Sequence, residues 1–204
     1  MEGGNKEKAI LDAAEQVFLD KGYAASRTTE IAKMAGVTHA MLHYYYRTKE
    51  NLFNKVFDEK IQLLNNSFSL VFRKDLPFLE KVKLAVETHF DFLSANPKLP
   101  SFLLREVITN QERKEVFKGM LFPKLVKVFI SLEKEIKAEI EKGTIVDISP
   151  ANLLLNIGSL NAASIVAVLV LFEDEDEQVN KAKEEFLRQR KASNVDFILR
   201  SLRP

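Results

Sequence analysis

The 204-residue sequence contains no cysteine and no tryptophan, and it has only three histidines. Without cysteine, the chain forms no disulfide and offers no thiolate to a metal ion. A glycine-rich phosphate loop, a G-x-S-x-G motif and a His-Glu-x-x-His motif are also missing from the sequence. His39 and His43 have the i, i+4 spacing of a helical metal pair, but no third ligand accompanies them. We therefore expect no catalysis, no cofactor and no metal site.

Signals for export and for membrane insertion are weak. The N-terminal residues MEGGNKEKAI contain no apolar core of a secretory signal, so a cytoplasmic protein is expected. Residues 148–172 carry no charge and are long enough to span a membrane. However, Asn156 and Asn161 interrupt this stretch, and its flanks are acidic where lysine or arginine is typical. A buried helix with a stripe of small residues explains the stretch better.

Charge is almost balanced over the whole chain, with 30 basic and 29 acidic residues and a net charge of +1. Between Lys21 and Lys49, however, five basic residues accompany one acidic residue, Glu30, so this stretch has a net charge of +4. A positive field confined to one stretch is expected of a surface that neutralises phosphates. The sequence therefore indicates nucleic acid as a partner of this stretch.

The stretch from Ser26 to Phe53 predicts two short helices joined by a glycine turn. Ser26 and Thr28 are candidate caps of the first helix, and Gly36 can adopt the positive φ that ends it. Thr38 is a candidate N-cap of the second helix. Two such helices form a helix-turn-helix, whose second helix enters the major groove of DNA by its N-terminal end.

The order AGVTHAMLHYYYRTKENLF resembles the signature of the tetracycline-repressor family of bacterial regulators, and the resemblance covers roughly residues 6 to 57. His43 stands where the family usually has a tyrosine, and Tyr45 stands where a histidine is common. The pair Ala40-Met41 replaces a more usual Gly-Thr pair. These departures leave the operator sequence open. The rest of the chain resembles the family only in its helical layout.

The resemblance implies an all-α fold of about nine helices. It implies a three-helix helix-turn-helix DNA-binding domain at residues 1–50, followed by a larger effector-binding and dimerisation domain at residues 51–204. Apolar residues at helical spacing agree with it and predict helices at 5–21, 102–108, 113–141, 150–173 and 177–202. Pro123 predicts a kink or a restart of the third of these. The expected buried residues of the last helix are Val179, Ala182, Phe186, Ser193 and Phe197.

Residues at the front of the second short helix and around it are the candidates for DNA contact. The predicted DNA-binding residues are Arg27, Thr28, Thr38, His39, Ala40, Met41, His43, Tyr44, Tyr45 and Lys49. None of those at the helix front is a bidentate reader such as arginine or asparagine, so selectivity is expected to rest partly on DNA shape. Lys49 opens the next helix and can offer charge to a phosphate. One of Tyr44 and Tyr45 can instead pack inward.

The second domain is expected to hold a small-molecule cavity with apolar walls and a few polar groups. The predicted lining residues are Phe68, Phe72, His89, Phe92, Phe102, Arg105, Phe122 and Phe129. The alternative is that these phenylalanines are ordinary core residues, that His89 is a satisfied core histidine, and that Arg105 forms a surface pair with Glu106.

The resemblance also implies a homodimer whose four-helix interface is built from the last two helices. The predicted interface residues are Gly158, Ser159, Ala162, Val166, Phe186 and Phe197. A dimer would separate two recognition helices by about one DNA turn, roughly 34–36 Å. The alternative is that the small residues of this region pack only within one chain.

Together these observations predict a DNA-binding transcriptional regulator, with a repressor as the favoured kind. Its partners would be a palindromic double-stranded DNA operator, a second copy of the chain and a small-molecule effector that releases the operator. One alternative is a DNA-binding interaction protein of the same fold, with a protein partner and no small-molecule effector. Another is a helical ligand carrier or enzyme that uses no DNA.

Overall fold

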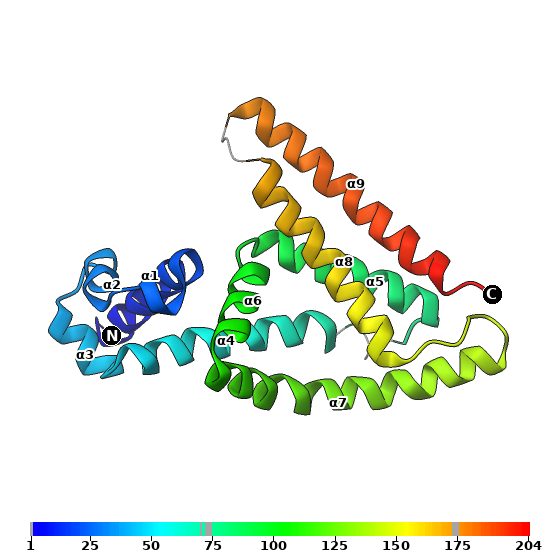
Figure 1. Cartoon of the computed structure of the whole chain (residues 1–204), viewed down its shortest axis with the longest axis horizontal. Helices are drawn as coiled ribbons and strands as arrows, with labels where there is room; N and C mark the ends of the chain where they lie inside the picture. Colours follow the sequence, from blue (N-terminus) through cyan, green and yellow to red (C-terminus); the bar gives the residue numbers. More distant parts are fainter. Residues whose placement is uncertain (1, 70, 72–74, 173–175) are drawn as a thin grey trace. The chain divides into compact units, whose positions relative to one another are not determined.

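The computed structural model describes residues 2–69, 71, 75–172 and 176–204. This part of the chain is helical and contains no strand, so the all-α prediction is confirmed (Figure 1). Its nine α-helices are α1 (Glu2–Ala25), α2 (Thr28–Met34), α3 (His39–Tyr46), α4 (Lys49–Ser69), α5 (Phe78–Ala95), α6 (Leu99–Thr109), α7 (Gln111–Glu141), α8 (Pro150–Leu171) and α9 (Glu177–Ser201).

The helices form two compact units. Unit 1 comprises Met1–Leu63 and Ser101–Met120, and unit 2 comprises Leu64–Pro100 and Leu121–Pro204. Unit 1 therefore contains most of α6 and the first turns of α7, in addition to the helix-turn-helix. Helices α4 and α7 each contribute residues to both units. The functional boundary predicted after residue 50 stays a prediction.

Helix α1 forms the centre of unit 1. Its predicted apolar stripe is buried and consists of Ile10, Ala13, Ala14, Val17 and Phe18. The stripe packs with apolar residues of α2, α3 and α4 because each of these helices also turns one face inward. Gly22 has φ 73° and ψ 176°, so the regular helix breaks where the sequence predicts its end. The chain makes one further turn, to Ala25.

The predicted caps of α2 are wrong. The N-cap is Arg27, and no side chain caps this helix. Ser26 is buried, and its hydroxyl donates to the carbonyl oxygen of Gly22 at the end of α1. The Thr28 hydroxyl shares a hydrogen bond with the His39 ring. The Ser26 hydroxyl therefore bonds back to the turn before it and the Thr28 hydroxyl contacts the next helix, so neither caps α2.

The glycine turn and the cap of α3 agree with the prediction. Gly36 has φ 65°, the left-handed conformation that glycine adopts without a steric cost. The Thr38 hydroxyl accepts a hydrogen bond of 3.2 Å from the backbone N–H of Met41 and caps α3. The Thr48 hydroxyl accepts one of 3.1 Å from Asn51 and caps α4 in the same way.

Unit 2 is organised around α5, α8 and α9, which pack against one another. The inner face of α5 is buried and includes Val82, Ala85, Val86, His89, Phe90 and Leu93. The predicted inner face of α9 is wrong in part, because Ala182, Ser193 and Phe197 are exposed. Asn194 and Ile198 are the buried residues of α9 instead. The reason is that a buried polar contact, from Asn194 to Asn161 on α8, sets the rotation of this helix.

Helices α7 and α8 also differ from the expectations. The helix α7 runs from Gln111 to Glu141 through Pro123, so no restart occurs there. Helix α8 is long and apolar enough to cross a membrane by length and composition alone. Only 33% of its apolar stretch is buried, so burial in the core of one chain does not explain the apolar character of this helix. Leu155, Val166 and Val170 are among its exposed apolar residues.

Candidate nucleic-acid interface

Helix α3 has one buried face and one exposed face. Leu42 and Tyr46 are buried, one helical turn apart, and anchor α3 to the core of unit 1. His39, Ala40, His43 and Tyr44 are exposed, and Tyr44 is 82% exposed. The outward face therefore consists of the residues that the sequence predicts as DNA contacts. Thr38 and Arg27 are also exposed, and Met41 and Thr28 are half-buried.

Two histidines on this face are held in defined orientations. Nε2 of His39 lies 2.9 Å from the Thr28 hydroxyl, which ties the front of α3 to the first turn of α2. Nδ1 of His43 lies 2.7 Å from the carbonyl oxygen of Arg47, so this nitrogen must carry the proton and donate it. Nε2 of His43 is then an acceptor that can receive a hydrogen bond from a donor on a base edge. The two rings pack edge to face, with centroids 4.4 Å apart.

The tyrosines follow on the next turn. The rings of Tyr44 and Tyr45 pack edge to face at 5.4 Å, and Tyr45 is half-buried whereas Tyr44 projects outward. A phenol group in the position of Tyr44 can donate to a phosphate oxygen, which fixes the register of a protein on DNA without reading its sequence.

Arg47 is a site residue that the sequence analysis missed. It is exposed and ends α3 with φ 58°, the one positive φ outside glycine in the described part of the chain. Such a conformation is unfavourable for residues with a Cβ atom and is often found beside functional surfaces. One feature of the sequence indicates it, because Arg47 belongs to the basic stretch between Lys21 and Lys49.

Lys49 opens α4 and is half-buried. Its ammonium nitrogen lies 4.3 Å from the centroid of the Tyr23 ring, in a cation–π contact. Burial and, next, the nearby guanidinium of Arg113 lower the pKa of Lys49, against the opposing effect of Glu50 and Glu106. Lys49 was predicted only as a phosphate contact. In the structure it also belongs to a cluster of charged side chains with Arg113, Glu50 and Glu106.

Residues of α6 and α7 complete this cluster. Glu106 is 3% exposed, and its Oε1 accepts a hydrogen bond of 3.0 Å from the backbone N–H of Tyr23. Its Oε2 accepts one of 2.8 Å from the guanidinium of Arg113, which is 7% exposed. The Arg113 guanidinium carbon lies 3.9 Å from the centroid of the Tyr23 ring and 4.5 Å from that of Phe53.

The approach of α6 to the end of α1 requires glycine at position 22. A Cβ atom on Gly22 would lie 2.8 Å from Oε1 of Glu106 and 2.9 Å from Nε of Arg105, closer than atoms pack. The Arg105 guanidinium also donates to the carbonyl oxygens of Phe18 and Leu19 near the end of α1, at 3.5 and 3.4 Å. The end of α1 is therefore held by α6 through backbone groups.

Comparison with known proteins agrees with this geometry. Residues 10–56 match the model of the bacterial regulatory proteins of the tetR family. Over this segment the chain belongs to the tetR family. The match covers α1, α2, α3 and the first turns of α4, the segment that carries every predicted DNA-binding residue.

The similarity to two curated relatives extends beyond this segment. The chain is 28% identical over 121 residues to the fatty acid metabolism regulator protein of Bacillus subtilis, covering 57% of this chain and 62% of that relative. The chain therefore spans about three fifths of the length of that relative. It is 24% identical over 184 residues to the HTH-type transcriptional regulator EthR of Mycolicibacterium smegmatis, covering 89% and 81%.

The fold is shared over nearly the whole chain with solved structures. One of these is the transcriptional regulator FadR from Bacillus subtilis in complex with stearoyl-CoA. Its TM-score is 0.64 at 20% identity, with 95% of this chain and 98% of that chain covered. The likeness extends the family's helical layout to the described helices of unit 2.

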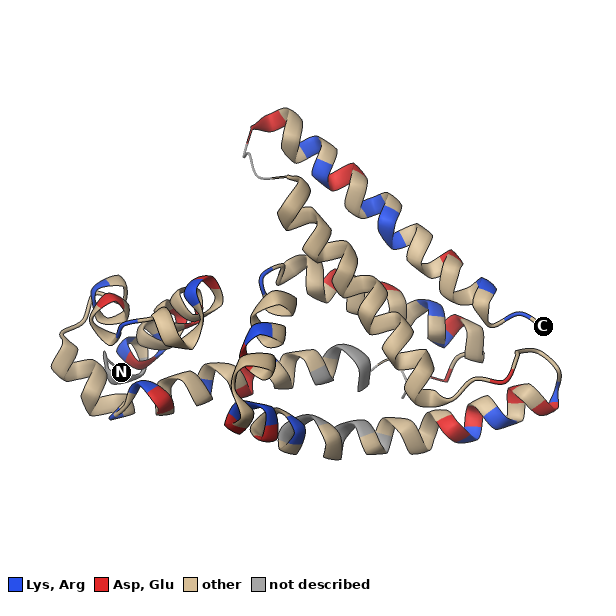
Figure 2. Ribbon diagram, in the orientation of Figure 1, with Lys and Arg blue, Asp and Glu red and all other residues tan. Residues whose placement is uncertain are grey.

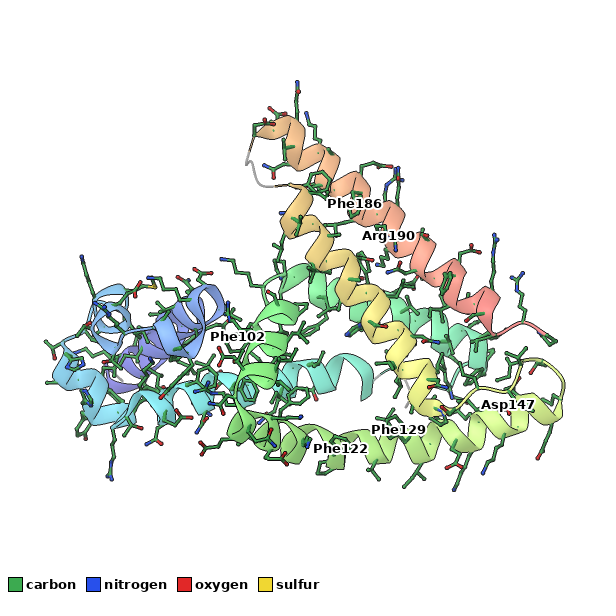
Figure 3. All side chains as sticks on the ribbon, viewed as in Figure 1. Phe102, Phe122, Phe129, Asp147, Phe186 and Arg190 are labelled. Carbon is green, nitrogen blue, oxygen red and sulfur yellow. The ribbon has the colours of Figure 1, made fainter. Side chains whose placement is uncertain are left out.

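The predicted effector residues are divided between the two units. Phe102 and Arg105 belong to unit 1, where Phe102 packs against Phe53 and Phe57. His89, Phe92, Phe122 and Phe129 belong to unit 2. Of these, His89 is buried, Phe92 and Phe129 are half-buried against the core, and Phe122 is 55% exposed. Phe122 and Phe129 both lie on α7 (Figure 3). Phe72 and the side chain of Phe68 lie outside the described part of the chain.

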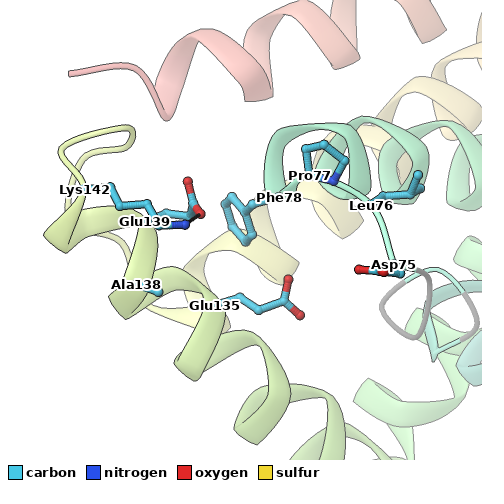
Figure 4. A pocket seen from close by; sticks show the side chains of 8 residues that line it. All are labelled: Asp75, Leu76, Pro77, Phe78, Glu135, Ala138, Glu139 and Lys142. Carbon is cyan, nitrogen blue, oxygen red and sulfur yellow. Dashed lines mark hydrogen bonds and ion pairs between the residues drawn. The ribbon is translucent and has the colours of Figure 1, made fainter.

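Unit 2 has a hollow of about 450 Å³ at the start of α5, beside the end of α7 (Figure 4). Its lining residues are Asp75, Leu76, Pro77, Phe78, Glu135, Ala138, Glu139 and Lys142. None of them is a predicted effector residue. Lys81 donates to Glu135 at 2.6 Å and Lys142 donates to Glu139 at 2.7 Å, so two of the three carboxylates are paired. The hollow is open and polar, unlike an apolar ligand cavity.

The predicted dimer residues of the family lie on α8 and α9. Ser159, Val166 and Phe197 are exposed, while Gly158, Ala162 and Phe186 are half-buried. A Cβ atom on Gly158 would meet nothing within 4 Å, so this glycine is not needed for packing inside one chain. Helix α8 carries no charged residue, whereas α9 carries many of both signs (Figure 2). Phe186 instead packs against Phe172, with ring centroids 5.5 Å apart.

No group of three or more histidine, aspartate or glutamate side chains gathers in metal-binding geometry in the described part of the chain. The His39–His43 pair is engaged by Thr28 and by the Arg47 carbonyl group. The structure therefore places this pair on the exposed face of α3.

Proposed function

We propose that the chain is a cytoplasmic DNA-binding transcriptional regulator that represses by binding a palindromic operator. One observation carries the proposal: the outward face of α3 presents His39, Ala40, His43 and Tyr44, while Leu42 and Tyr46 anchor the same helix in the core. A rigid helix with an exposed polar face at its N-terminal end is the arrangement by which a helix-turn-helix reads a major groove.

The proposed active form is a homodimer. Its support is the exposed apolar face of α8, where Leu155 is 67% exposed and Val170 is 66% exposed, together with Phe197 on α9 at 61%. A second copy that covers this face would remove the exposed apolar area from water. A two-fold axis would then repeat the recognition helix and match the symmetry of a palindrome.

The proposed regulation is a shift between two states of the dimer. Helix α4 begins with Lys49 in unit 1 and continues into unit 2, so it joins the DNA-binding surface to the region proposed for the effector. An effector changes operator affinity only to the extent that it binds one state more tightly. The similarity to the fatty acid metabolism regulator of Bacillus subtilis makes a fatty acyl derivative the first effector class to test.

The alternative is a regulator whose second unit binds a protein and no small molecule. Three exposed apolar side chains on α7 favour it, since Phe122, Val126 and Ile130 lie at i, i+4 and i+8. Addition of stearoyl-CoA to the DNA complex discriminates the two ideas: release of DNA supports an effector, and retention under all acyl chain lengths supports the alternative.

The experiment for the proposed function is a fluorescence anisotropy titration of a duplex taken from upstream of the chain's own gene. The proposal predicts binding at least about 10³-fold tighter than to a shuffled duplex at the same salt concentration. His39→Ala and Tyr44→Ala should weaken binding to the cognate duplex. Equal binding to the cognate and shuffled duplexes would contradict the proposal.

A further inference from the structure

Lys49 lies close to two carboxylates and yet forms no ion pair with either in the described part of the chain. Both Glu50 and Glu106 act electrostatically on its ammonium group. In place of an ion pair, the Lys49 ammonium rests 4.3 Å from the centroid of the Tyr23 ring. An ammonium group next to two carboxylates normally pairs with one of them. Because Lys49 does not, another cation must pair with the carboxylates of Glu50 and Glu106.

Arg113, at the start of α7, is that cation. Its Nη1 donates to Oε2 of Glu106 at 2.8 Å, and its Nη2 lies 3.6 Å from Oε2 of Glu50. A guanidinium group can serve two carboxylates at once, whereas an ammonium on a flexible stem acts as a point charge. Arg113 also shares the Tyr23 ring with Lys49, which keeps the two cations beside each other.

The remaining cation beside Glu106 is already engaged. Nε of Arg105 lies 3.8 Å from Oε1 of Glu106, on the oxygen that Tyr23 also contacts. The Arg105 guanidinium is held by the carbonyl oxygens of Phe18 and Leu19. Loss of Arg113 would therefore leave Oε2 of a buried carboxylate without its cation, and Lys49 is the half-buried cation that can turn toward it.

We propose that Arg113 is a positioning residue for DNA binding: it occupies the carboxylates of Glu50 and Glu106, so that the Lys49 ammonium stays available for a backbone phosphate. This inference rests on the proposed function, because it assigns Lys49 to the phosphate. Arg113 is 7% exposed and makes no contact with DNA in this scheme. Its effect on affinity passes through Lys49.

The test is a set of variants in which operator affinity is measured from about 50 to 200 mM salt. Lys49→Ala should lower the salt slope by about 1, the change expected when one phosphate contact is lost. Arg113→Gln should produce the same drop in slope, and the Lys49→Ala, Arg113→Gln double variant should show no further drop. The matched control is Lys114→Gln, which removes one charge from the adjacent exposed residue of α7 and should leave the slope unchanged.

A rescue variant separates this role from a purely structural one. The triple variant Glu50→Gln, Glu106→Gln, Arg113→Gln removes both carboxylates together with their cation, so no charge is left buried without a partner. It should regain the wild-type slope, because nothing then draws Lys49 away from the phosphate. If Arg113→Gln alone does not fold, the triple variant still tests the inference. Additive losses in the double variant, or no recovery in the triple variant, would overturn the inference.

A readout without DNA distinguishes failure of this inference from failure of the proposed function. The pKa of Lys49, followed by NMR of its side chain, should rise in Arg113→Gln, as the ammonium approaches the carboxylates. A raised Lys49 pKa in a protein that binds no operator would refute the proposed function. It would still support the inference that Arg113 keeps Lys49 from pairing with Glu50 and Glu106. An unchanged Lys49 pKa in a folded Arg113→Gln variant would overturn the inference.

Discussion

The side-chain amide of Asn161 donates to Nδ1 of His89 at 3.2 Å inside unit 2, and its second N–H donates to the carbonyl oxygen of Val86 at 2.9 Å. Nδ1 of His89 must therefore be unprotonated, because it accepts. Asn194 on α9 donates in turn to Oδ1 of Asn161 at 2.9 Å. This polar contact between α5, α8 and α9 depends on a neutral imidazole.

The first prediction concerns the pH dependence of stability. Burial lowers the pKa of His89 from 6.5 to about 4. A lowered pKa contributes stability that is present above pH 6.5 and lost as the pH falls toward 4, because the unfolded chain binds the proton first. The loss from this group should reach about 3 kcal/mol, at 1.36 kcal/mol for each pKa unit.

The measurement is urea unfolding of the wild type and of His89→Gln between pH 7 and pH 4. His89→Gln keeps an amide beside Asn161 but does not titrate there, so its stability should fall less steeply. Carboxylates affect both proteins alike and cancel in the difference. Parallel pH profiles would show that the His89 imidazole does not stay neutral in the folded chain.

The second prediction concerns Gly22. Alanine at this position must adopt φ 73° and place its Cβ atom 2.8 Å from Oε1 of Glu106. We expect Gly22→Ala to destabilise the protein by more than about 2 kcal/mol, since the strain of a positive φ alone costs roughly 1–2 kcal/mol. Gly36→Ala is the matched control, because Gly36 has φ 65° and no atom within 4 Å of its Cβ position.

Chemical denaturation of both variants gives the comparison. The excess loss in Gly22→Ala over Gly36→Ala reports the close approach of α6 together with the ψ of 176° at Gly22, a backbone region that essentially only glycine adopts. Equal losses would mean that Glu106 can move away at no cost, which would weaken the account of how α6 holds Tyr23.

The third prediction concerns the Tyr46 hydroxyl. It is buried and has no hydrogen-bond partner among the described residues, and burial raises its pKa to about 12. Tyr46→Phe removes the unpaired polar group and keeps the ring that anchors α3. We expect it to stabilise the protein by about 1 kcal/mol, since a buried unsatisfied hydroxyl costs roughly 1–3 kcal/mol. A lower melting temperature for Tyr46→Phe would show that the hydroxyl has a partner that stabilises the fold.

The fourth prediction concerns the dimer. Val166→Glu and Phe197→Glu place a charge on the exposed apolar face of α8 and α9. Each should raise the dimer dissociation constant at least about a hundredfold, or about 3 kcal/mol, since a charge buried in an apolar interface lacks a partner. Sedimentation equilibrium measures it. Leu104→Glu is the control, because Leu104 is exposed on α6, outside the predicted interface. Dissociation by Leu104→Glu alone would place the interface elsewhere.

Features set by local chemistry were predictable from the sequence. Thr38 and Thr48 cap the helices that they precede, and Gly22 and Gly36 interrupt helices, because each effect depends on residues within one turn. The buried stripe of α1 and the buried face of α5 follow from helical periodicity in the same way. The outward placement of His39 then follows from that of Leu42.

Features set by contacts between distant residues were not predictable. The bond from Tyr23 to Glu106 joins residues 83 positions apart, and no local pattern indicates it. Thr28 resembles a cap in the sequence, but its hydroxyl instead shares a hydrogen bond with His39, 11 positions away on the next helix. The rotation of α9 depends on Asn194, a polar residue that a search for apolar stripes passes over. For the same reason, the helical spacing of the phenylalanines could not show whether they line a cavity or belong to the core.

The most direct test of the account is the stoichiometry of the chain on its own upstream DNA, measured by sedimentation velocity together with the salt dependence of affinity. The account predicts an even number of chains on each duplex, and an affinity that falls at least about tenfold between roughly 50 and 200 mM salt. A chain that sediments as a monomer in the presence of that duplex and leaves it unbound at low salt would contradict the account.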